Sequence, residues 1–227
     1  MRQIALMIAA AAIVTSGPAA AAWQTYTNEP LGYSVMFPAK PKEGTGVYRS
    51  DLAPNAMTHY STLKDGDTTF IALEIDTGRV EDGAILMGEF EYWLGHFGDI
   101  ALDNVSRLTA GMEYGRFLTI DCRDDVIPEG PNQTVRAHQM FKDAAELVCP
   151  NGARLTTNVF FTQGRLYAIT GIETGEDAKV ADEPGRFANS IAWVGVNADH
   201  AQTLVDRTAR AAAQAAAAAA AGRGGAR

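Results

Sequence analysis

The chain has 227 residues, a formal charge of −8 and a pI near 5.0, and 47% of its residues are hydrophobic. This length and composition suit one globular domain with a sizeable core. The acidic balance argues against a nucleic-acid surface, because phosphate binding needs clustered Lys and Arg, and it is equally unsuited to adhesion to anionic lipid.

The N-terminus has the order of a secretory signal peptide. Arg2 gives a short basic start, residues 4–14 are apolar, and small residues up to Ala22 precede Trp23. Such a pattern predicts cleavage after Ala22, with Ala20 as the weaker alternative. The apolar run has eleven residues, whereas a membrane-spanning helix needs about 20. We therefore expect a periplasmic or secreted protein without a transmembrane segment after cleavage.

Alternating apolar and polar residues predict several strands in the first third of the chain. The Asp65-Gly66 pair favours a tight hairpin turn because both residues tolerate positive φ. The strand that follows this turn carries closely spaced apolar residues, which is typical of a central strand buried on most of its surface. The strands are expected at residues 23–28, 33–37, 46–52, 57–63 and 68–76.

Residues 82–98 change to a helical period, with large apolar residues at three- and four-residue steps. Asp82 is a suitable N-cap and Gly98 a suitable end. The aromatic residues of this helix have two interpretations. They pack on the sheet as core, which we favour, or they line a pocket for an apolar ligand. These residues are Phe90, Trp93 and Phe97.

The second half of the chain predicts an antiparallel meander. Strands are expected at 104–109, 114–123 and 134–141. The run from Ala153 to Ile172 then forms two long strands around a Gln163-Gly164 turn, and a short closing helix follows. Hairpin-length connections favour antiparallel pairing. The fold class is therefore α+β, a mostly antiparallel β-sheet flanked by helices.

The two cysteines, Cys122 and Cys149, lie 27 positions apart in the exported part of the chain. In an oxidising compartment such a pair usually forms a disulfide. Closing this loop is worth roughly 3–4 kcal/mol. A metal pair or a redox pair is the alternative, but neither the C-x-x-C spacing nor a flanking histidine is present.

The C-terminal part is low in complexity. Residues 208–221 are nearly all alanine, and a Gly/Arg segment follows. Alanine favours helix, but this run has no apolar stripe that could anchor it to a core. We expect a frayed helix or a disordered tail, with a tether to the cell wall or to a partner as the functional alternative. The chain is thus divided into 1–22, 23–197 and 198–227 as signal peptide, domain and tail.

No catalytic constellation is recognisable. The four histidines have no metal-ligand spacing, and neither a nucleophile motif nor a phosphate-binding glycine loop occurs. The carboxylates beside Cys122 could serve acid/base chemistry or hold calcium, but a solvated acidic loop is the simpler interpretation. We assign no catalytic, cofactor-binding or metal-binding residue. The groups considered are His59, His96, His138 and His200, and Asp121, Asp124, Asp125 and Glu129.

Several short segments resemble the PsbP-like superfamily. They are Gly32-Tyr-Ser-Val-Met-Phe-Pro38, Arg165-Leu-Tyr167 and Arg186-Phe-Ala-Asn-Ser-Ile191, in a similarity that spans about Tyr26–Val194. The resemblance implies an α/β/α sandwich around an antiparallel sheet, and a role in binding or assembly without a catalytic motif. The chain departs from the family in its cysteine pair, in an insertion at 142–152 and in the alanine-rich tail.

These observations favour an exported, non-catalytic binding or assembly accessory of the cell envelope, with an envelope protein as partner and no cofactor. One alternative is a small periplasmic hydrolase or metal-dependent enzyme that uses Asp121, Asp124, Asp125 or His138. The other is a carrier that holds an apolar ligand beneath the helix at 82–98.

Overall fold

The computed structural model describes residues 22–50, 52–53, 56–78, 83–106, 112, 114–123 and 137–224. The predicted signal peptide therefore lies almost entirely outside the described residues. The same holds for Asp82, for Asp124, Asp125 and Glu129, and for parts of the predicted strands at 104–109 and 134–141.

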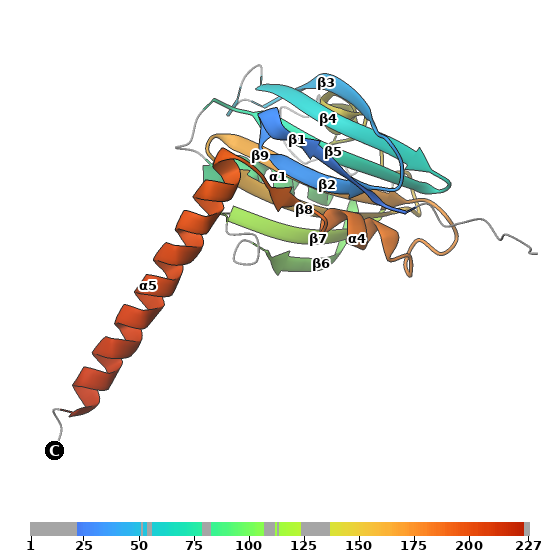
Figure 1. The fold of residues 1–227 in the computed structure, drawn as a ribbon. Coiled ribbons are helices and arrows are strands. Elements are labelled where there is room, and N and C mark those ends of the chain that lie inside the picture. The colour runs from blue at the N-terminus through green and yellow to red at the C-terminus, as the bar shows by residue number, and fades with distance from the viewer. Residues whose placement is uncertain are drawn as a thin grey trace, which may run out of the picture.

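The core of the molecule is a seven-stranded antiparallel sheet (Figure 1). Its spatial order is β3-β4-β5-β9-β8-β7-β6, so the last long hairpin is inserted between β5 and β7. The strands are β3 (Lys42–Tyr48), β4 (Ala56–Asp65), β5 (Thr68–Asp76), β6 (Gly98–Val105), β7 (Tyr114–Cys122), β8 (Arg154–Thr162) and β9 (Arg165–Glu173).

A smaller three-stranded sheet packs beside the large one. Its order is β1-β2-β10, with all pairs antiparallel. The strands are β1 (Gln24–Asn28), β2 (Tyr33–Phe37) and β10 (Ala192–Trp193), and the short 3-10 helix η1 (Glu29–Leu31) connects the first two. Gly32 ends η1 with φ of +76°, a left-handed conformation that glycine adopts without steric cost.

The predicted hairpin of two long strands around Gln163-Gly164 is confirmed as β8 and β9, and it lies in the middle of the large sheet. Thr162 pairs with Arg165 across a two-residue turn in which Gln163 and Gly164 have φ of 49° and 78°. Positive φ at both turn positions matches the right-handed twist of the flanking strands. β8 and β9 are buried at every position except their first residues, which are only partly buried.

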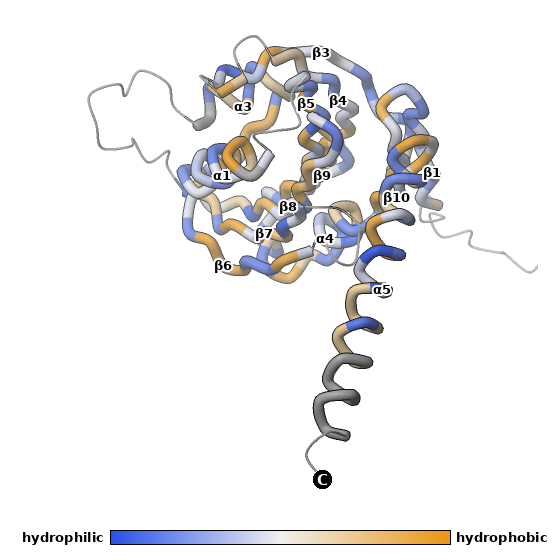
Figure 2. The backbone as a smooth tube through the Cα atoms, turned by 90° about the vertical axis from the view of Figure 1, so that its left-hand side faces the viewer, coloured by the Kyte–Doolittle hydropathy of each residue, from blue (hydrophilic) through white to orange (hydrophobic). Residues whose placement is uncertain are grey.

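Helices cover both faces of the large sheet, which confirms the predicted α+β class. Figure 2 shows the strands curving around α1 and α3, with β1, β10 and α4 on the other side. The two faces hold separate apolar clusters: one gathers under α1 and α3, and the other under α4 and the small sheet. The helices are α1 (Gly83–Leu94) with the short η2 (Gly95–Phe97), α3 (Ala137–Ala145) and α4 (Glu183–Ala188).

The strand predicted at 134–141 was wrong, because the structure has helix α3 from Ala137. Four apolar residues recur along this helix at one- and three-residue steps, which places them on one helical face. All four are buried in the cluster beneath α1 and α3. They are Met140, Phe141, Ala144 and Ala145. Half of this stripe lies beyond the predicted strand, in the segment 142–152 to which no helix or strand was assigned.

Two edge strands begin earlier than predicted. β3 begins at Lys42, where we expected residue 46, and β6 begins at Gly98, where we expected residue 104. Every residue of β6 after Gly98 is exposed, so the strand lacks the alternation that marks a half-buried strand. A Cβ on Gly98 would come within 2.0 Å of the Asp121 carbonyl oxygen, so β6 can pair closely with β7 only with glycine here.

The C-terminal part forms helix α5 (Val196–Gly224), which projects away from the domain (Figure 1). Its first residues contact the small sheet: Asn197 is buried and Ala201 packs against the cluster beneath α4. From Val205 to residue 216 the side chains are exposed. Across the described part of the chain, no helix combines the length and apolar character needed to cross a membrane.

Candidate functional site

The predicted cysteine pair is a structural crosslink. The sulfur atoms of Cys122 and Cys149 lie 1.92 Å apart, at disulfide distance. Cys122 ends β7, and Cys149 follows α3 in the segment that leads into β8. Around the bond, the Cys122 backbone N–H donates to the Ala153 oxygen (2.8 Å) and that of Gly152 donates to the Cys122 oxygen (2.9 Å). The disulfide therefore fastens the chain after α3 to the end of β7.

The residues considered for acid/base chemistry are placed on different elements. Asp121 lies in β7 and His138 in α3. Asp121 accepts a hydrogen bond from the Arg154 guanidinium at 2.7 Å, and the Lys179 ammonium lies 3.5 Å from its second oxygen. These contacts give Asp121 a role in holding β7, β8 and the following loop together. The other three predicted carboxylates are outside the described residues.

The aromatic residues of the 82–98 helix belong to the core, as we favoured. Phe90 is 1% exposed and Phe97 is fully buried, and both rings contact Phe141 of α3, with ring centroids 5.1 and 5.2 Å apart. Trp93 is partly buried and packs against the same cluster. This face of α1 is thus used to join the helix to α3 and the sheet.

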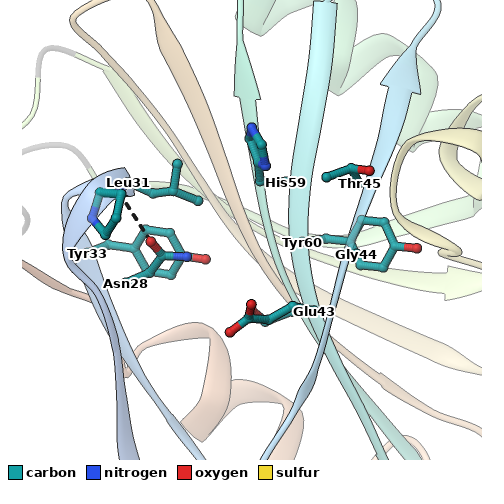
Figure 3. A pocket seen from close by; sticks show the side chains of 10 residues that line it. Asn28, Leu31, Tyr33, Glu43, Gly44, Thr45, His59 and Tyr60 are labelled. Carbon is teal, nitrogen blue, oxygen red and sulfur yellow. Dashed lines mark hydrogen bonds between the residues drawn. The ribbon is translucent and has the colours of Figure 1, made fainter.

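A groove on the opposite side of the large sheet is the candidate functional site. It has a volume of about 390 Å³ and lies between η1 with β2 on one side and β3 with β4 on the other (Figure 3). We call it the η1 groove. Cavities of this size suit small ligands or single side chains of a partner. Its lining residues are Asn28, Pro30, Leu31, Tyr33, Glu43, Gly44, Thr45, His59, Tyr60 and Ser61.

Strand register explains which side chains reach this groove. Glu43 pairs with Ser61, and Thr45 pairs with His59, so all four side chains stand on the same face of the sheet. Gly44 stands between Glu43 and Thr45 on the other face. A Cβ there would come within 2.4 Å of the Tyr60 ring. The missing side chain lets the Tyr60 ring lie across β3, and Figure 3 shows it turned away from the groove.

A hydrogen bond joins the two sheets at the groove. The Tyr26 hydroxyl of β1 donates to a carboxylate oxygen of Glu43 in β3. Burial and the neighbouring Glu43 raise the pKa of Tyr26 above its ordinary value, so the hydroxyl keeps its proton and remains a donor. Glu43 is exposed on the groove side. This contact orients a carboxylate that still has free acceptor positions.

Tyr33 contributes a buried polar atom to the groove. The side chain is 0% exposed, and its hydroxyl has no hydrogen-bond partner in the described part of the molecule. In Figure 3 the hydroxyl is directed into the space between η1 and β3. Burial raises the pKa of Tyr33, the nearby Tyr26 and Glu74 raise it further, and the neighbouring Ser61 hydroxyl lowers it. A buried hydroxyl without a partner is costly, so this position favours a ligand or an ordered water.

Glu74 is a buried acid behind the groove. It pairs directly with His59 across β4 and β5 and with Tyr167 across β5 and β9. Its side chain is 0% exposed, and neither carboxylate oxygen has a hydrogen bond in the described structure. Burial raises the pKa of Glu74 to about 7, which Arg165 opposes and Asp76 reinforces. Buried acids with such a pKa often mark functional sites.

The neighbours of Glu74 fix the groove wall formed by η1. The Arg165 guanidinium lies 3.4 Å from Glu74 and 3.6 Å from Asp76. The Tyr167 hydroxyl donates to the Leu31 oxygen of η1 at 2.9 Å and accepts from the Asn197 amide at 2.9 Å. These bonds connect β9, η1 and the start of α5. The wall opposite β3 is therefore held by side chains from three separate parts of the chain.

A second cavity, of about 370 Å³, lies at the margin of α1 and β7. Arg116 spans it, with contacts to Glu91 at 3.6 Å and to Asp103 at 2.5 Å. Burial raises the pKa of Glu91, opposed by Arg116. Its remaining lining residues are Met87, Gly88, Val105, Tyr114 and Gly115.

Within the described ranges, no group of three or more His, Cys, Asp or Glu side chains is arranged to hold a metal ion. No family model matches the chain, and no curated protein shows a significant match to it.

The residues that build the η1 groove were missed as a site by sequence reasoning. His59 was considered only as one of four scattered histidines, Tyr33 was assigned to an ordinary strand position, and Glu43 lay outside the predicted strands. One signal was present: Glu74 is a charged residue within the apolar run of the predicted central strand 68–76. A carboxylate at such a position is rarely buried without a reason.

Proposed function

We propose that this chain is an exported, non-catalytic binding or assembly protein of the cell envelope, and that it binds its partner through the η1 groove. The observation that carries the proposal is the groove itself. It is open and about 390 Å³ in volume, and polar groups converge on it from both sheets. Export is inferred from the signal-like order of residues 1–22.

The groove has the features of a binding site and lacks a recognisable catalytic arrangement among its lining residues. Ser61 and His59 both line the groove, but no nucleophile motif such as G-x-S-x-G and no phosphate-binding glycine motif occurs in the chain. Glu74 has the pKa of an acid/base group but does not line the cavity. The resemblance to the PsbP-like superfamily, whose members mostly act in binding or assembly, supports the same proposal.

The proposal is tested by photo-crosslinking from within the groove. A photoreactive residue at Thr45, which is exposed in the groove, should crosslink one reproducible envelope protein in intact cells. The same residue at Val180, which is 78% exposed and is not a lining residue, serves as the control. The crosslinked partner is identified by mass spectrometry and checked by the reciprocal experiment.

A blocking variant makes the test specific to the groove. His59→Trp places a large ring in the groove and should abolish the Thr45 crosslink. Met57→Trp is the matched control, because Met57 is 49% exposed on the same face of β4 but does not line the groove. A crosslink that persists in His59→Trp, or one that appears equally from Val180, would contradict the proposal.

A carrier of small apolar molecules is the second candidate, favoured by the cavity between α1 and β7. Native mass spectrometry of the purified chain tests it. A co-purifying molecule whose occupancy falls in Met87→Trp, but not in Met57→Trp, would support this function over the first.

A further inference from the structure

The formally charged lining of the η1 groove is negative. Glu43 is its single formally charged lining residue, and neither Lys nor Arg is among the lining residues. A second carboxyl, Glu74, stands behind the lining next to His59 in the sheet, where the Arg165 guanidinium lies 3.4 Å from it. An anionic ligand would meet a carboxylate without a counter-charge. A cationic ligand would gain a partner, so the groove favours positive charge.

The hydrogen-bonding groups favour a ligand that donates. Glu43 is held by Tyr26 and keeps free acceptor positions toward the groove. The Tyr33 hydroxyl, 0% exposed and without a partner, is aimed into the same space. Thr45 and Ser61 add hydroxyl groups from the two strands. An ammonium group has three donors and no acceptor, so it can use the carboxylate and the hydroxyl oxygens together.

The shape and the apolar part of the lining suit a short aliphatic stem. A water molecule takes about 30 Å³, so a cavity of about 390 Å³ has room for a chain of several methylenes with a charged end. Pro30, Leu31 and the ring of Tyr33 supply apolar surface along which such a stem can lie, as lysine stems do on protein surfaces.

We propose that the η1 groove binds a primary ammonium group on an aliphatic stem, with the Glu43 carboxylate as its ion-pair partner and the Tyr33 hydroxyl as a hydrogen-bond acceptor. The ammonium belongs either to a lysine side chain of a partner protein or to a free diamine. This inference rests on the proposed function, because it assumes that the η1 groove is the binding site and names the chemical group bound there.

The test is a titration of the purified chain followed by ¹H–¹⁵N NMR. The probes are 1,5-diaminopentane and a short neutral-backbone peptide with one lysine; 1-pentanol and the norleucine peptide are their uncharged counterparts. We expect at least one of the two amine probes to change the amide chemical shifts of the groove strands β2, β3 and β4. The uncharged counterparts should leave the chemical shifts of these amides unchanged. Tighter binding of the peptide assigns the ammonium to a partner, and equal binding assigns it to a free amine.

Three variants connect the binding to the named groups. Glu43→Gln should weaken amine binding at least about tenfold, because a hydrogen bond to a charged group is lost. Tyr33→Phe should weaken it several-fold while the fold is retained, since the hydroxyl has no partner to lose. Glu29→Gln is the matched control, because Glu29 is exposed on η1 but does not line the groove. It should leave the affinity unchanged.

Equal binding of 1-pentanol and diaminopentane would overturn the inference, as would an unchanged affinity in Glu43→Gln. An absence of shifts at about 10 mM of either amine, which places Kd well above the millimolar range, would overturn it too. If the amines fail while the Thr45 crosslink remains sensitive to His59→Trp, the binding function stands and only the ammonium chemistry is wrong. If the crosslink fails as well, both proposals are wrong.

Discussion

Glu74 gives the sharpest prediction about stability. Its carboxyl is fully buried, and burial raises its pKa from an ordinary value of 4.5 to about 7. Below about pH 4.5 the group is protonated in both the folded and the unfolded chain. Between pH 4.5 and 7 the unfolded chain releases the proton while the folded chain keeps it, so the free energy of unfolding falls as pH rises. The loss amounts to about 3 kcal/mol by pH 8.

Replacing Glu74 by Gln removes this titration. The difference in free energy of unfolding between the native chain and Glu74→Gln should therefore shift by about 3 kcal/mol between pH 4 and pH 8, in favour of the variant at high pH. Urea unfolding measures it, with the fluorescence of Trp23, Trp93 and Trp193 as the signal. The pH dependence of the difference is the quantity compared, because the new amide also changes the absolute stability at every pH.

Asp76→Asn is the matched control for this experiment. Asp76 lies two residues along the same strand and contacts the same Arg165, but its side chain is 46% exposed. The control should keep most of the fall in stability with rising pH that the native chain shows. Parallel curves for the native chain and Glu74→Gln would refute the reasoning, since they would mean that Glu74 ionises at the same pH in the folded and unfolded chains.

Three further predictions concern the fold. Replacing Cys122 and Cys149 together by Ser should lower the free energy of unfolding by about 3–4 kcal/mol, as measured by urea unfolding, because the crosslink closes a 27-residue loop; a change below about 1 kcal/mol would contradict this. Phe187→Ala should cost about 3–5 kcal/mol, since Phe187 is 0% exposed and its ring packs against those of Phe37 and Phe70, whereas Val180→Ala at an exposed position should cost less than about 0.5 kcal/mol. Removal of residues 207–227 should reduce the helical circular dichroism signal without lowering Tm, because side chains from Val205 to residue 216 are exposed; a clear fall in Tm would show that the distal part of α5 contacts the domain.

Local patterns were sufficient where one face of a strand is buried and turn residues bound it. β2 and β5 were predicted with the bounds that the structure has, and the β8–β9 hairpin was placed around its Gln163-Gly164 turn. In these segments alternation and turn chemistry agree with the final packing. α1 was placed within a few residues for the same reason, since its apolar stripe faces the core.

Local patterns failed for elements that are exposed or very short, because such elements show no clear hydrophobic periodicity. β6 is exposed along its length and β3 along most of it, so neither shows which face is buried. The segment that contains α3 has an apolar stripe, but only nine residues are helical, and its first half is compatible with a strand. The helix is selected because its stripe completes the cluster that α1 and β3 leave open.

By itself, the amino-acid sequence determined the α+β class, the central hairpin and the pairing of the two cysteines, because these follow from short-range periodicity, turn residues and the number of thiols. Only the tertiary structure decided that β9 inserts beside β5, that η1 lies across the groove from β3 and β4, and that Glu74 is buried behind this groove. Each of these depends on contacts between segments distant in the chain. The groove joins residues near position 30 to residues near position 60, and its wall is fixed by Tyr167 and Asn197. No local pattern encodes such contacts, because burial of a polar group is a property of the packed molecule.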